Sequence, residues 1–360
     1  AAQDVCADFT RAEKLLAFNN PMMNLCVNGA FVVIIYLGSK LIITSQGTLF
    51  DVGQLSSTFT YGFQILMSLM QLSMIFVMVT MSEESANRIV EVLNAEPTIT
   101  NPAEAAHEVA DGSIDFDHVS FKYSEHAERQ ALDDIDLHIA SGETVGIIGG
   151  TGSAKSTLVN LIARLYDATE GTVRVGGRDV RSYDLDALRH EVAMVLQKNV
   201  LFSGTIRENL SMGDRGAGEA QLCAALETAQ AADFVAEAGG LDAVLVQGGV
   251  NLSGGQRQRL SLARALVRGG AVLVLDDCTS ALDPATERRV LDGLERRPGQ
   301  AVLHITQKVR AARTADRILV LEEGRQVGLG THRSLLDTCP TYREIWASQA
   351  PEEEGEDGTR

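Results

Sequence analysis

The sequence has little of what builds disulfide frameworks or metal sites. Its 360 residues include five cysteines, which are scattered, form no C-x-x-C pair and have no histidine nearby at the spacing of metal ligands. This pattern indicates neither a metal site nor a disulfide framework, and it favours reduced thiols in or facing a cytosol. The five are Cys6, Cys26, Cys223, Cys278 and Cys339.

Positive charge is also scarce. The 31 Lys and Arg residues stand against 48 Asp and Glu residues, so the formal net charge is -17. Because a phosphate backbone is bound by a basic surface, this composition argues against nucleic acid as a partner. Part of the excess is local, since the acidic run at 352–357 is typical of a solvated chain end. We therefore expect a disordered acidic tail at 347–360.

No secretory signal is recognisable at the start of the chain. Residue 1 is alanine, and the first twenty positions include Asp4, Asp8 and Glu13, which is unlike a signal peptide. We expect the chain to begin within a longer protein. With 45% hydrophobic and 22% charged residues, the composition is that of a globular chain of one to three domains.

Charge is absent from two long apolar runs near the start. Residues 22–39 and 52–81 contain no Asp, Glu, Lys or Arg, and a helix of about 20 such residues crosses a hydrocarbon layer. We therefore expect membrane spans at about 21–44 and 52–81, in contact with a lipid bilayer. The connection at 45–51 is short enough to make the two helices an antiparallel hairpin. The alternative is a hairpin buried in a soluble core.

The second apolar run has two recognisable helix faces, one polar and one rich in methionine, about a quarter-turn apart. Polar groups inside a membrane face protein or water, so the polar face either lines a pathway or packs against neighbouring helices. The methionines either offer an adaptable apolar surface or pack in the same way. The polar face comprises Ser57, Tyr61, Gln64, Ser68 and Gln71, and the methionine face comprises Met67, Met70, Met74, Met78 and Met81.

Charged residues return after the second apolar run. They interleave with aliphatic residues as in a cytoplasmic continuation of the helix, and Pro97 and Pro102 end the helix and open a linker. Residues 1–111 are therefore expected to form a partial transmembrane domain, with the helix extension and linker at 82–111. Strands and helices then alternate over 112–346, which predicts an α/β domain.

A glycine-rich turn at 149–157 is the segment most informative about chemistry. It follows an apolar run and precedes a helix-like one, the order of a phosphate-binding loop. In such a loop the backbone N–H groups point at a phosphate, Lys155 supplies a cation for the β- and γ-phosphates, and Ser156 is placed to ligate Mg²⁺. Ala154 replaces the second glycine of G-x-x-x-x-G-K-[ST]. The loop is Gly149, Gly150, Thr151, Gly152, Ser153, Ala154, Lys155, Ser156 and Thr157.

Two further motifs lie downstream of this loop. The apolar run 271–275 is typical of a buried strand, and Asp276 follows it, placed to hold Mg²⁺ opposite Ser156, directly or through water. Between the loop and this strand lies LSGGQ at 252–256. With that pentapeptide in that position, the sequence resembles the ATP-binding cassette (ABC) family, whose signature it is.

The resemblance implies ATP and Mg²⁺ as cofactors and assigns further residues. Tyr123 matches the aromatic residue that stacks on adenine, and Gln197 matches the glutamine that meets Mg²⁺ and senses the membrane domain. The loop 280–283 matches one that lies across the dimer interface of nucleotide-binding domains. The implied metal ligands are Ser156, Gln197 and Asp276. The implied nucleotide-binding residues are Tyr123, Gly150, Thr151, Gly152, Ser153, Ala154, Lys155, Ser156, Thr157, Gln197, Asp276, Ser253, Gly254, Gly255 and Gln256.

The resemblance also implies an architecture and a location. The two hydrophobic helices look like the last two spans of a type IV ABC exporter half, whose membrane domain has six, so four spans are expected upstream. The implied fold is the C-terminal part of an all-α membrane domain followed by an α/β P-loop ABC ATPase domain. The implied location is the cytoplasmic membrane, as a multi-pass protein with its nucleotide-binding domain in the cytoplasm.

The sequence departs from the family pattern in several places. The glutamate that positions the attacking water is Asp277 here, which is one methylene shorter. The switch histidine that contacts the γ-phosphate is Gln307, whose neutral amide carries no proton, and His304 is a poor substitute because strand parity places it on the opposite face. Ala154 costs roughly 1–2 kcal/mol if its φ is positive, and little if it is right-handed. Gln247 stands where exporters often have a glutamate that touches a coupling helix.

These departures bear on how the chain works in a dimer. In the ABC dimer each nucleotide lies between the phosphate loop of one subunit and the signature of the other. We therefore expect a weak own site, with Lys155, Asp277 and Gln307 as its catalytic residues, while the signature residues complete a competent site on a partner. That arrangement is the one found in heterodimeric ABC exporters. The signature residues are Ser253, Gly254, Gly255 and Gln256.

Three alternatives stay open at this point. The substitutions are neutral drift in a site that still hydrolyses ATP, or the chain is a nucleotide-gated regulatory subunit without turnover at its own site. The third is a soluble ABC ATPase of DNA repair or translation, which the apolar segment at 21–81 and the acidic charge disfavour. The exported molecule is not identified by the sequence, although amphipathic drugs, lipids and peptides are compatible with the faces of the second span.

Overall fold

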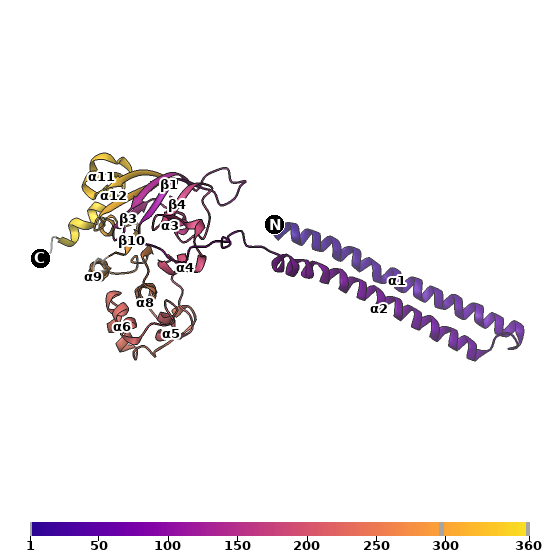
Figure 1. Cartoon of the computed structure of the whole chain (residues 1–360). Coiled ribbons are helices and arrows are strands. Elements are labelled where there is room, and N and C mark those ends of the chain that lie inside the picture. The colour runs from indigo at the N-terminus through magenta and orange to yellow at the C-terminus, as the bar shows by residue number, and fades with distance from the viewer. Residues whose placement is uncertain (1, 295–298, 358–360) are drawn as a thin grey trace. The chain divides into compact units, whose positions relative to one another are not determined.

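The structure is a computed structural model that describes residues 2–294 and 299–357. It divides into two compact units, Ala1–Glu96 and Pro97–Arg360. Figure 1 shows the first unit as a pair of long helices and the second as an α/β domain. The order that the sequence predicts, apolar helices followed by an α/β domain, is therefore confirmed.

The first unit is a helical hairpin. Helix α1 (Ala2–Ser45) includes Pro21, and helix α2 (Val52–Leu93) begins at a cap formed by Asp51. The Asp51 carboxylate accepts a hydrogen bond from the backbone N–H of Gln54 (2.7 Å), and the Gln54 side-chain oxygen accepts one from the backbone N–H of Asp51 (3.1 Å). This reciprocal cap satisfies backbone donors that the first turn of a helix leaves unpaired, and it defines where α2 starts.

The two helices of the hairpin lie antiparallel and in contact. The ring centroids of Phe31 and Phe59 are 4.5 Å apart, and Gly38 has no room for a Cβ because the Leu55 side chain lies against it. Pro21–Ser45 and Val52–Leu93 are each long and apolar enough to cross a membrane, and their most apolar windows are unburied. The antiparallel hairpin is therefore as expected, and nothing in the described chain buries it as a soluble core would.

The linker after the hairpin packs with the second unit. The backbone N–H of Ala106 donates to the Ser182 carbonyl (2.9 Å), and the Asn101 side chain donates to the Asp184 carboxylate (2.6 Å). The compact units accordingly divide after Glu96, whereas the sequence places the boundary after residue 111. Local composition does not reveal that the linker belongs to the second unit, because the linker's contacts are made with residues some 80 positions later.

The larger sheet of the second unit has the strand order β12-β11-β3-β10-β9-β6. Its neighbours are parallel from β11 to β6, and β12 pairs antiparallel with β11. Because parallel strands end at one edge, the segments that follow β3, β9 and β10 meet there. The strands are β3 (Thr144–Gly149), β6 (Val192–Val195), β9 (Val272–Asp276), β10 (Ala301–Ile305), β11 (Arg317–Glu322) and β12 (Arg325–Gly330).

The smaller sheet is antiparallel, with the order β2-β1-β4-β5. Its inner face shares an apolar core with β3 and with α3 (Lys155–Ile162), in which Phe116, Ile135, Ile147 and Leu158 are buried. This core anchors the loop between β3 and α3 from both sides. The strands are β1 (Ile114–Phe121), β2 (Leu132–Ile139), β4 (Glu170–Val175) and β5 (Arg178–Asp179).

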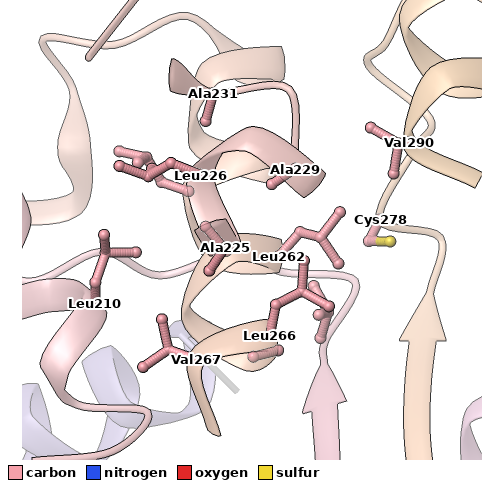
Figure 2. Close-up of a cluster of buried hydrophobic side chains, with 14 of the residues drawn as sticks. Leu210, Ala225, Leu226, Ala229, Ala231, Leu262, Leu266, Val267, Cys278 and Val290 are labelled. Carbon is pink, nitrogen blue, oxygen red and sulfur yellow. The ribbon is translucent and has the colours of Figure 1, made fainter. Parts of the chain in front are cut away.

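A mainly helical region is inserted between β6 and β9. Figure 2 shows part of its core, whose buried side chains include Leu226, Leu262 and Leu266. Helix α8 begins at the signature, so this core holds the signature helix in place. The elements are α5 (Ile206–Ser211), α6 (Glu219–Thr228), α7 (Ala232–Glu237), η2 (Gln247–Gly249), α8 (Gly254–Arg268), and the short strands β7 (Gly204–Thr205) and β8 (Val244–Leu245).

The remaining elements cover the larger sheet and close the chain. Helix α12 extends to Asp357, within the segment 347–360 for which the sequence predicts an acidic tail. Residues 358–360 of that segment lie outside the described residues. The elements are η1 (Val180–Ser182), α4 (Leu185–Glu191), α9 (Pro284–Leu294), α10 (Val309–Ala312), α11 (His332–Thr338) and α12 (Pro340–Asp357).

Candidate active site

The carboxyl ends of β3, β9 and β10 border one cavity of about 1330 Å³. Most of the site residues expected from the sequence line it, although they come from segments far apart in the chain. Gly150 lies beside this lining, within reach of the Lys155 side chain. The expected residues in the lining are Tyr123, Thr151, Gly152, Ser153, Ala154, Lys155, Ser156, Thr157, Gln197, Asp276, Asp277 and Gln307.

The loop between β3 and α3 requires glycine at particular positions. A Cβ at Gly149 would meet the Leu321 carbonyl oxygen and the Ser153 hydroxyl, so the backbone approaches its neighbours too closely for any side chain. Gly152 has φ +81°, a conformation that glycine adopts without steric cost. Sequence and structure therefore agree on a tight loop that turns its backbone toward the cavity.

Ala154 is the strained position of this loop. It caps α3 with φ 69° and ψ 23°, in the left-handed region, and its side chain makes no capping hydrogen bond. The sequence analysis considered a right-handed and a left-handed conformation for Ala154, and the structure has the left-handed one, which is higher in free energy. A non-glycine residue in this region loses roughly 1–2 kcal/mol relative to right-handed backbone.

Lys155 is the cation of the loop between β3 and α3. Its Nζ donates hydrogen bonds to the carbonyl oxygens of Gly149 (2.8 Å) and Gly150 (2.7 Å) and to Ser153 Oγ (3.1 Å). Half-burial lowers the pKa of Lys155, and the negative charges of the two aspartates after β9 oppose that shift. The ammonium group is therefore fixed at the loop and faces two carboxylates across the cavity.

Ser156 and Asp276 are brought together from positions 120 residues apart. Ser156 Oγ donates to Asp276 Oδ2 at 2.6 Å, and Asp276 is only 6% exposed at the end of β9. A hydroxyl and a carboxylate oxygen are ligands that Mg²⁺ accepts beside phosphate oxygens. Among the described residues no cluster of three or more His, Cys, Asp or Glu could hold a metal by itself, so this pair fits an ion bound together with a phosphate ligand.

Asp277 lies beside this pair in an unusual backbone conformation. Its φ is 51°, and its backbone N–H donates to the Ile305 carbonyl (3.0 Å), which ties the end of β9 to β10. Burial and the neighbouring Asp276 charge raise the pKa of Asp277, while Lys308 and a hydrogen bond from Gln197 act against the rise. A carboxylate with a raised pKa is a better proton acceptor, so the environment suits a base even though the side chain is short.

Gln307 and His304 are separated as strand parity predicts. Gln307 follows β10 and lines the cavity, whereas His304 lies within β10, is 2% exposed and does not line it. Burial lowers the pKa of His304 to about 4, so this histidine is neutral at physiological pH. Its Nε2 has no hydrogen-bond partner. His304 therefore does not replace a switch histidine.

Tyr123 forms an aromatic wall at one end of the cavity. Its hydroxyl is hydrogen-bonded to the Thr157 hydroxyl (2.8 Å), and its ring meets those of Phe121 (4.9 Å) and Tyr166 (5.2 Å) edge to face. Tyr123 is 57% exposed, so part of its ring is accessible to a ligand in the cavity. Tyr166 carries no local sequence signal, because it lies in the connection between α3 and β4 and meets Tyr123 from 43 positions further along the chain.

The signature residues form the N-terminus of α8. Ser253 Oγ accepts a hydrogen bond from the backbone N–H of Gln256 (3.3 Å), and the Gln256 side-chain oxygen accepts one from the Ser253 N–H (2.9 Å). Gly254 and Gly255 face Ala281, at 3.7 and 3.1 Å from the positions that their Cβ atoms would take. Of the described residues that line the cavity, none belongs to 252–256. The signature is thus a second site element, separate from the Lys155 cavity of the same chain.

Two side chains that the sequence analysis missed fasten these elements. Gln258 donates to Ser280 Oγ (3.0 Å) and accepts from the Ala281 N–H (3.0 Å), which joins the signature helix to the loop 280–283. Glu287 is buried and forms ion pairs with Lys308 (3.5 Å) and Arg310 (3.3 Å), next to Gln307. Neither has a sequence signal, because a glutamine or glutamate in an amphipathic helix is ordinarily a surface residue.

The fold and the site together define a class of protein. A phosphate loop after β3, a buried aspartate at the end of β9 and a separate LSGGQ helix make an α/β ATP-binding cassette domain. The model of the ABC transporter family matches residues 132–280. The match places residues 132–280 in an ABC transporter ATP-binding domain, the family to which this part of the chain belongs.

Curated relatives match nearly the whole chain. An uncharacterized ABC transporter ATP-binding protein of Mycobacterium tuberculosis is 40% identical over 336 residues, 92% of this chain and 57% of the relative. An ATP-dependent lipid A-core flippase of Vibrio vulnificus is 36% identical over 334 residues, 91% of this chain and 56% of the relative. A multidrug efflux ATP-binding/permease protein of Mycobacterium tuberculosis is 38% identical over 280 residues, 76% of this chain and 23% of the relative. The chain thus spans a little over half the length of the first two.

A solved structure supports the same assignment. A bacterial Atm1-family ABC exporter with ATP bound aligns with a TM-score of 0.75 and 31% sequence identity, over 95% of this chain and 60% of the other. The similarity therefore includes the apolar helices as well as the ATP-binding domain. The relatives named as transporters and exporters are thus similar to this chain over both its two candidate membrane spans and its ATP-binding domain.

Proposed function

We propose that the chain is part of one subunit of a heterodimeric ABC exporter in the cytoplasmic membrane. On this proposal its ATP-binding domain binds Mg²⁺ and ATP and dimerises on the nucleotide. Hydrolysis, mainly at the site that its signature completes on the partner, then drives export. Relatives named as a lipid A-core flippase and a multidrug efflux protein support export of amphipathic molecules.

The observation that supports this proposal is that the Lys155 cavity departs from the family pattern while the signature at 252–256 matches it. The Lys155 cavity contains a left-handed alanine, a shortened carboxylate and a glutamine in place of a histidine, at positions 154, 277 and 307. The signature is complete in sequence and is capped in both directions. Since the signature does not line its own chain's cavity, its use lies with a nucleotide bound elsewhere.

The chain's residues have distinct roles at the Lys155 site. Tyr123 would stack on the adenine, the loop N–H groups and Lys155 would bind the phosphates, and Ser156, Asp276 and Gln197 would hold Mg²⁺. When bound, Mg²⁺ would supply positive charge against the charge that builds up on the γ-phosphate. Asp277 orients the attacking water from a greater distance than a glutamate, and a misplacement of about 1 Å can lower a rate by ~10²-fold. ATP is therefore held firmly and hydrolysed slowly.

The polar face of α2 supports a role in export. Tyr61, Gln64 and Ser68 lie on one face of α2 beside Ile65, Leu69 and Leu72. A surface with both polar and apolar side chains suits an amphipathic molecule, because a polar group inside a membrane is stabilised by facing protein, water or cargo. This face is our candidate for the chain's share of the export pathway.

ATPase measurements on vesicles test the proposal. The chain is reconstituted alone and with candidate partner subunits, each as wild type and as Asp277→Asn. We expect little turnover alone, strong turnover with the right partner, and less than a twofold loss from Asp277→Asn in the complex. Vigorous turnover by this chain alone would contradict the proposal.

A single-turnover measurement separates the proposal from a purely regulatory subunit. Radiolabelled ATP trapped at the Lys155 site of the complex is followed by acid quench. Slow conversion to ADP, with transport that depends on hydrolysis at the other site, agrees with the proposal. ATP that stays intact while transport continues without hydrolysis by the partner would favour regulation instead.

A further inference from the structure

The loop that carries Gln307 is held by a side chain from the C-terminal helix. Gln349, on α12, donates from Nε2 to the Gln307 carbonyl oxygen (2.7 Å) and accepts at Oε1 from the Val309 backbone N–H (2.8 Å). The two bonds join segments 40 and 42 residues apart in sequence. One amide thus bridges the backbone on both sides of Lys308.

Helix α12 is seated firmly enough for Gln349 to act as a fixed point. Tyr342 is fully buried, and Ile345 and Trp346 pack against the same apolar cluster, which also contains Val309. Positions 342, 345, 346 and 349 follow the spacing of one helix face, so the face that anchors α12 also presents Gln349 to the loop. One face of α12 therefore both packs on the apolar cluster and carries the side chain that bonds to the Gln307 loop.

Other contacts hold the loop at different points. The Thr306 N–H donates to the Ile147 carbonyl (3.1 Å), which continues the pairing of β10 with β3. Lys308 reaches the buried Glu287 through its side chain (3.5 Å). Gln349 acts between these two attachments, on the peptide that sets the direction of the Gln307 side chain toward the cavity.

We propose that Gln349 is a positioning residue that holds Gln307 toward the γ-phosphate and thereby sets how well this site distinguishes ATP from ADP. The inference rests on the proposed function in one respect, that Gln307 is the residue facing the γ-phosphate. It adds that the C-terminal helix takes part in the nucleotide site. The requirement is for an amide, because one bond needs a donor and the other an acceptor.

Substitutions at Gln349 separate the two bonds. Gln349→Met keeps the length of the side chain and removes both hydrogen bonds. Gln349→Glu keeps the acceptor for the Val309 N–H and places a carboxylate oxygen against the Gln307 carbonyl. The matched control is Ser348→Ala, because Ser348 is exposed on the same helix and bonds only to the Ile345 carbonyl of its own turn among the described contacts.

Binding of nucleotides to the full chain tests the proposal. A non-hydrolysable ATP analogue and ADP, each with Mg²⁺, displace a fluorescent nucleotide from the protein. We expect Gln349→Met to weaken binding of the ATP analogue about tenfold, the effect of losing one or two hydrogen bonds, and ADP less than twofold. Gln349→Glu should act in the same direction, and Ser348→Ala should change neither affinity.

A double-mutant cycle with Gln307→Ala completes the experiment. If Gln349 acts through Gln307, Gln349→Met should add little once Gln307 is alanine. Equal losses for ADP and the ATP analogue, full additivity, or an unchanged ratio in either single variant would overturn the proposal. Because no hydrolysis is measured, these results do not depend on whether the Lys155 site is a slow ATPase, which the vesicle experiments decide.

Discussion

The two halves of the nucleotide machinery in this chain differ in backbone strain as well as in sequence. Among the residues that line the Lys155 cavity, three non-glycine residues have positive φ: Ala154 (69°), Asp277 (51°) and Glu323 (45°). The signature half begins at Ser253 with extended backbone and a reciprocal cap, and Gln258 fastens it to the loop 280–283. One half is strained and altered, and the other is intact.

The difference suggests how strongly each half depends on its geometry under the proposed function. A site that only has to hold ATP tolerates a strained loop and a short carboxylate, since binding uses many backbone contacts that these changes leave in place. A signature that completes another chain's site depends on the geometry of one helix N-terminus, and its glycines pack close to Ala281. The comparison therefore yields predictions that act on one half at a time.

The largest effect is expected from the signature half. Gly254→Asp places a carboxylate where a partner's γ-phosphate would lie, and the loss of one such electrostatic contact lowers turnover by about 10²–10³-fold. We expect that loss in the ATPase activity of the complex, while nucleotide binding to the Lys155 site stays unchanged. Gly218→Asp is the matched control, because Gly218 also stands at a helix start in open space. If Gly254→Asp lowers the ATPase activity of the complex less than tenfold, the signature half is not the one on which turnover depends.

The next effect comes from repairing the Lys155 half. Asp277→Glu combined with Gln307→His restores the family's residues, and we expect turnover at this site to rise by about 10²-fold, the effect of correcting a misplacement near 1 Å. The measurement is ATPase activity of a complex whose partner subunit has been inactivated. Adding Lys155→Ala should abolish the gain. If the repaired variant stays slow, the altered carboxylate and amide are not what limits this half.

A smaller effect concerns the buried histidine that precedes the altered switch position. The folded protein keeps His304 neutral with a pKa of about 4, against an ordinary value of 6.5. Between those values the unfolded chain binds the proton and the folded chain does not, so stability falls as pH drops below 6.5. At pH 5 the loss from this group is about 2 kcal/mol.

The change His304→Leu should remove that part of the pH dependence. Denaturant unfolding at pH 7 and pH 5 would show a smaller difference in the free energy of unfolding for the variant than for the wild type. His126→Leu, at an exposed position, should leave the difference as it is. Identical pH dependence in wild type and His304→Leu would show that the buried site takes up its proton as readily as the unfolded chain.

The smallest effect tests the strained alanine. Ala154→Gly relieves the left-handed conformation, and we expect a gain of about 1 kcal/mol in the free energy of unfolding, since the greater freedom of glycine in the unfolded chain offsets part of the relief. Thermal unfolding should move upward by about 2–4 °C. Ala224→Gly, on the exposed face of α6, is the control with the opposite sign, at a loss of about 1 kcal/mol.

Much of this molecule could be predicted where neighbours in sequence carry the information. The charge-free runs predict the helical hairpin, the loop at 149–157 predicts a phosphate site, and alternation along β10 predicts that His304 points away from the cavity that Gln307 lines. Each prediction depends on residues within one turn or one strand. The periodicity of hydrophobic residues and the steric limits of the backbone act between residues that are close in sequence, so the sequence alone predicts their effects.

Other features could not be predicted because their partners lie far along the chain. The linker residue Asn101 bonds to Asp184, Gln258 bonds to Ser280, and Gln349 bonds to the Gln307 peptide. Each is a polar residue of a common type in an ordinary context, and no local pattern distinguishes it from a solvated side chain.

The sequence by itself determined the parts: two apolar helices, a phosphate loop, a signature and a set of altered positions around them. The tertiary structure decided which parts meet. Strand order in the larger sheet brings Asp276 to Ser156 across 120 residues, Ala154 takes a left-handed backbone in the folded loop, and the signature lies outside its own chain's cavity. Local patterns encode what a segment prefers, whereas the choice of partner among distant segments depends on how the whole sheet and its core pack.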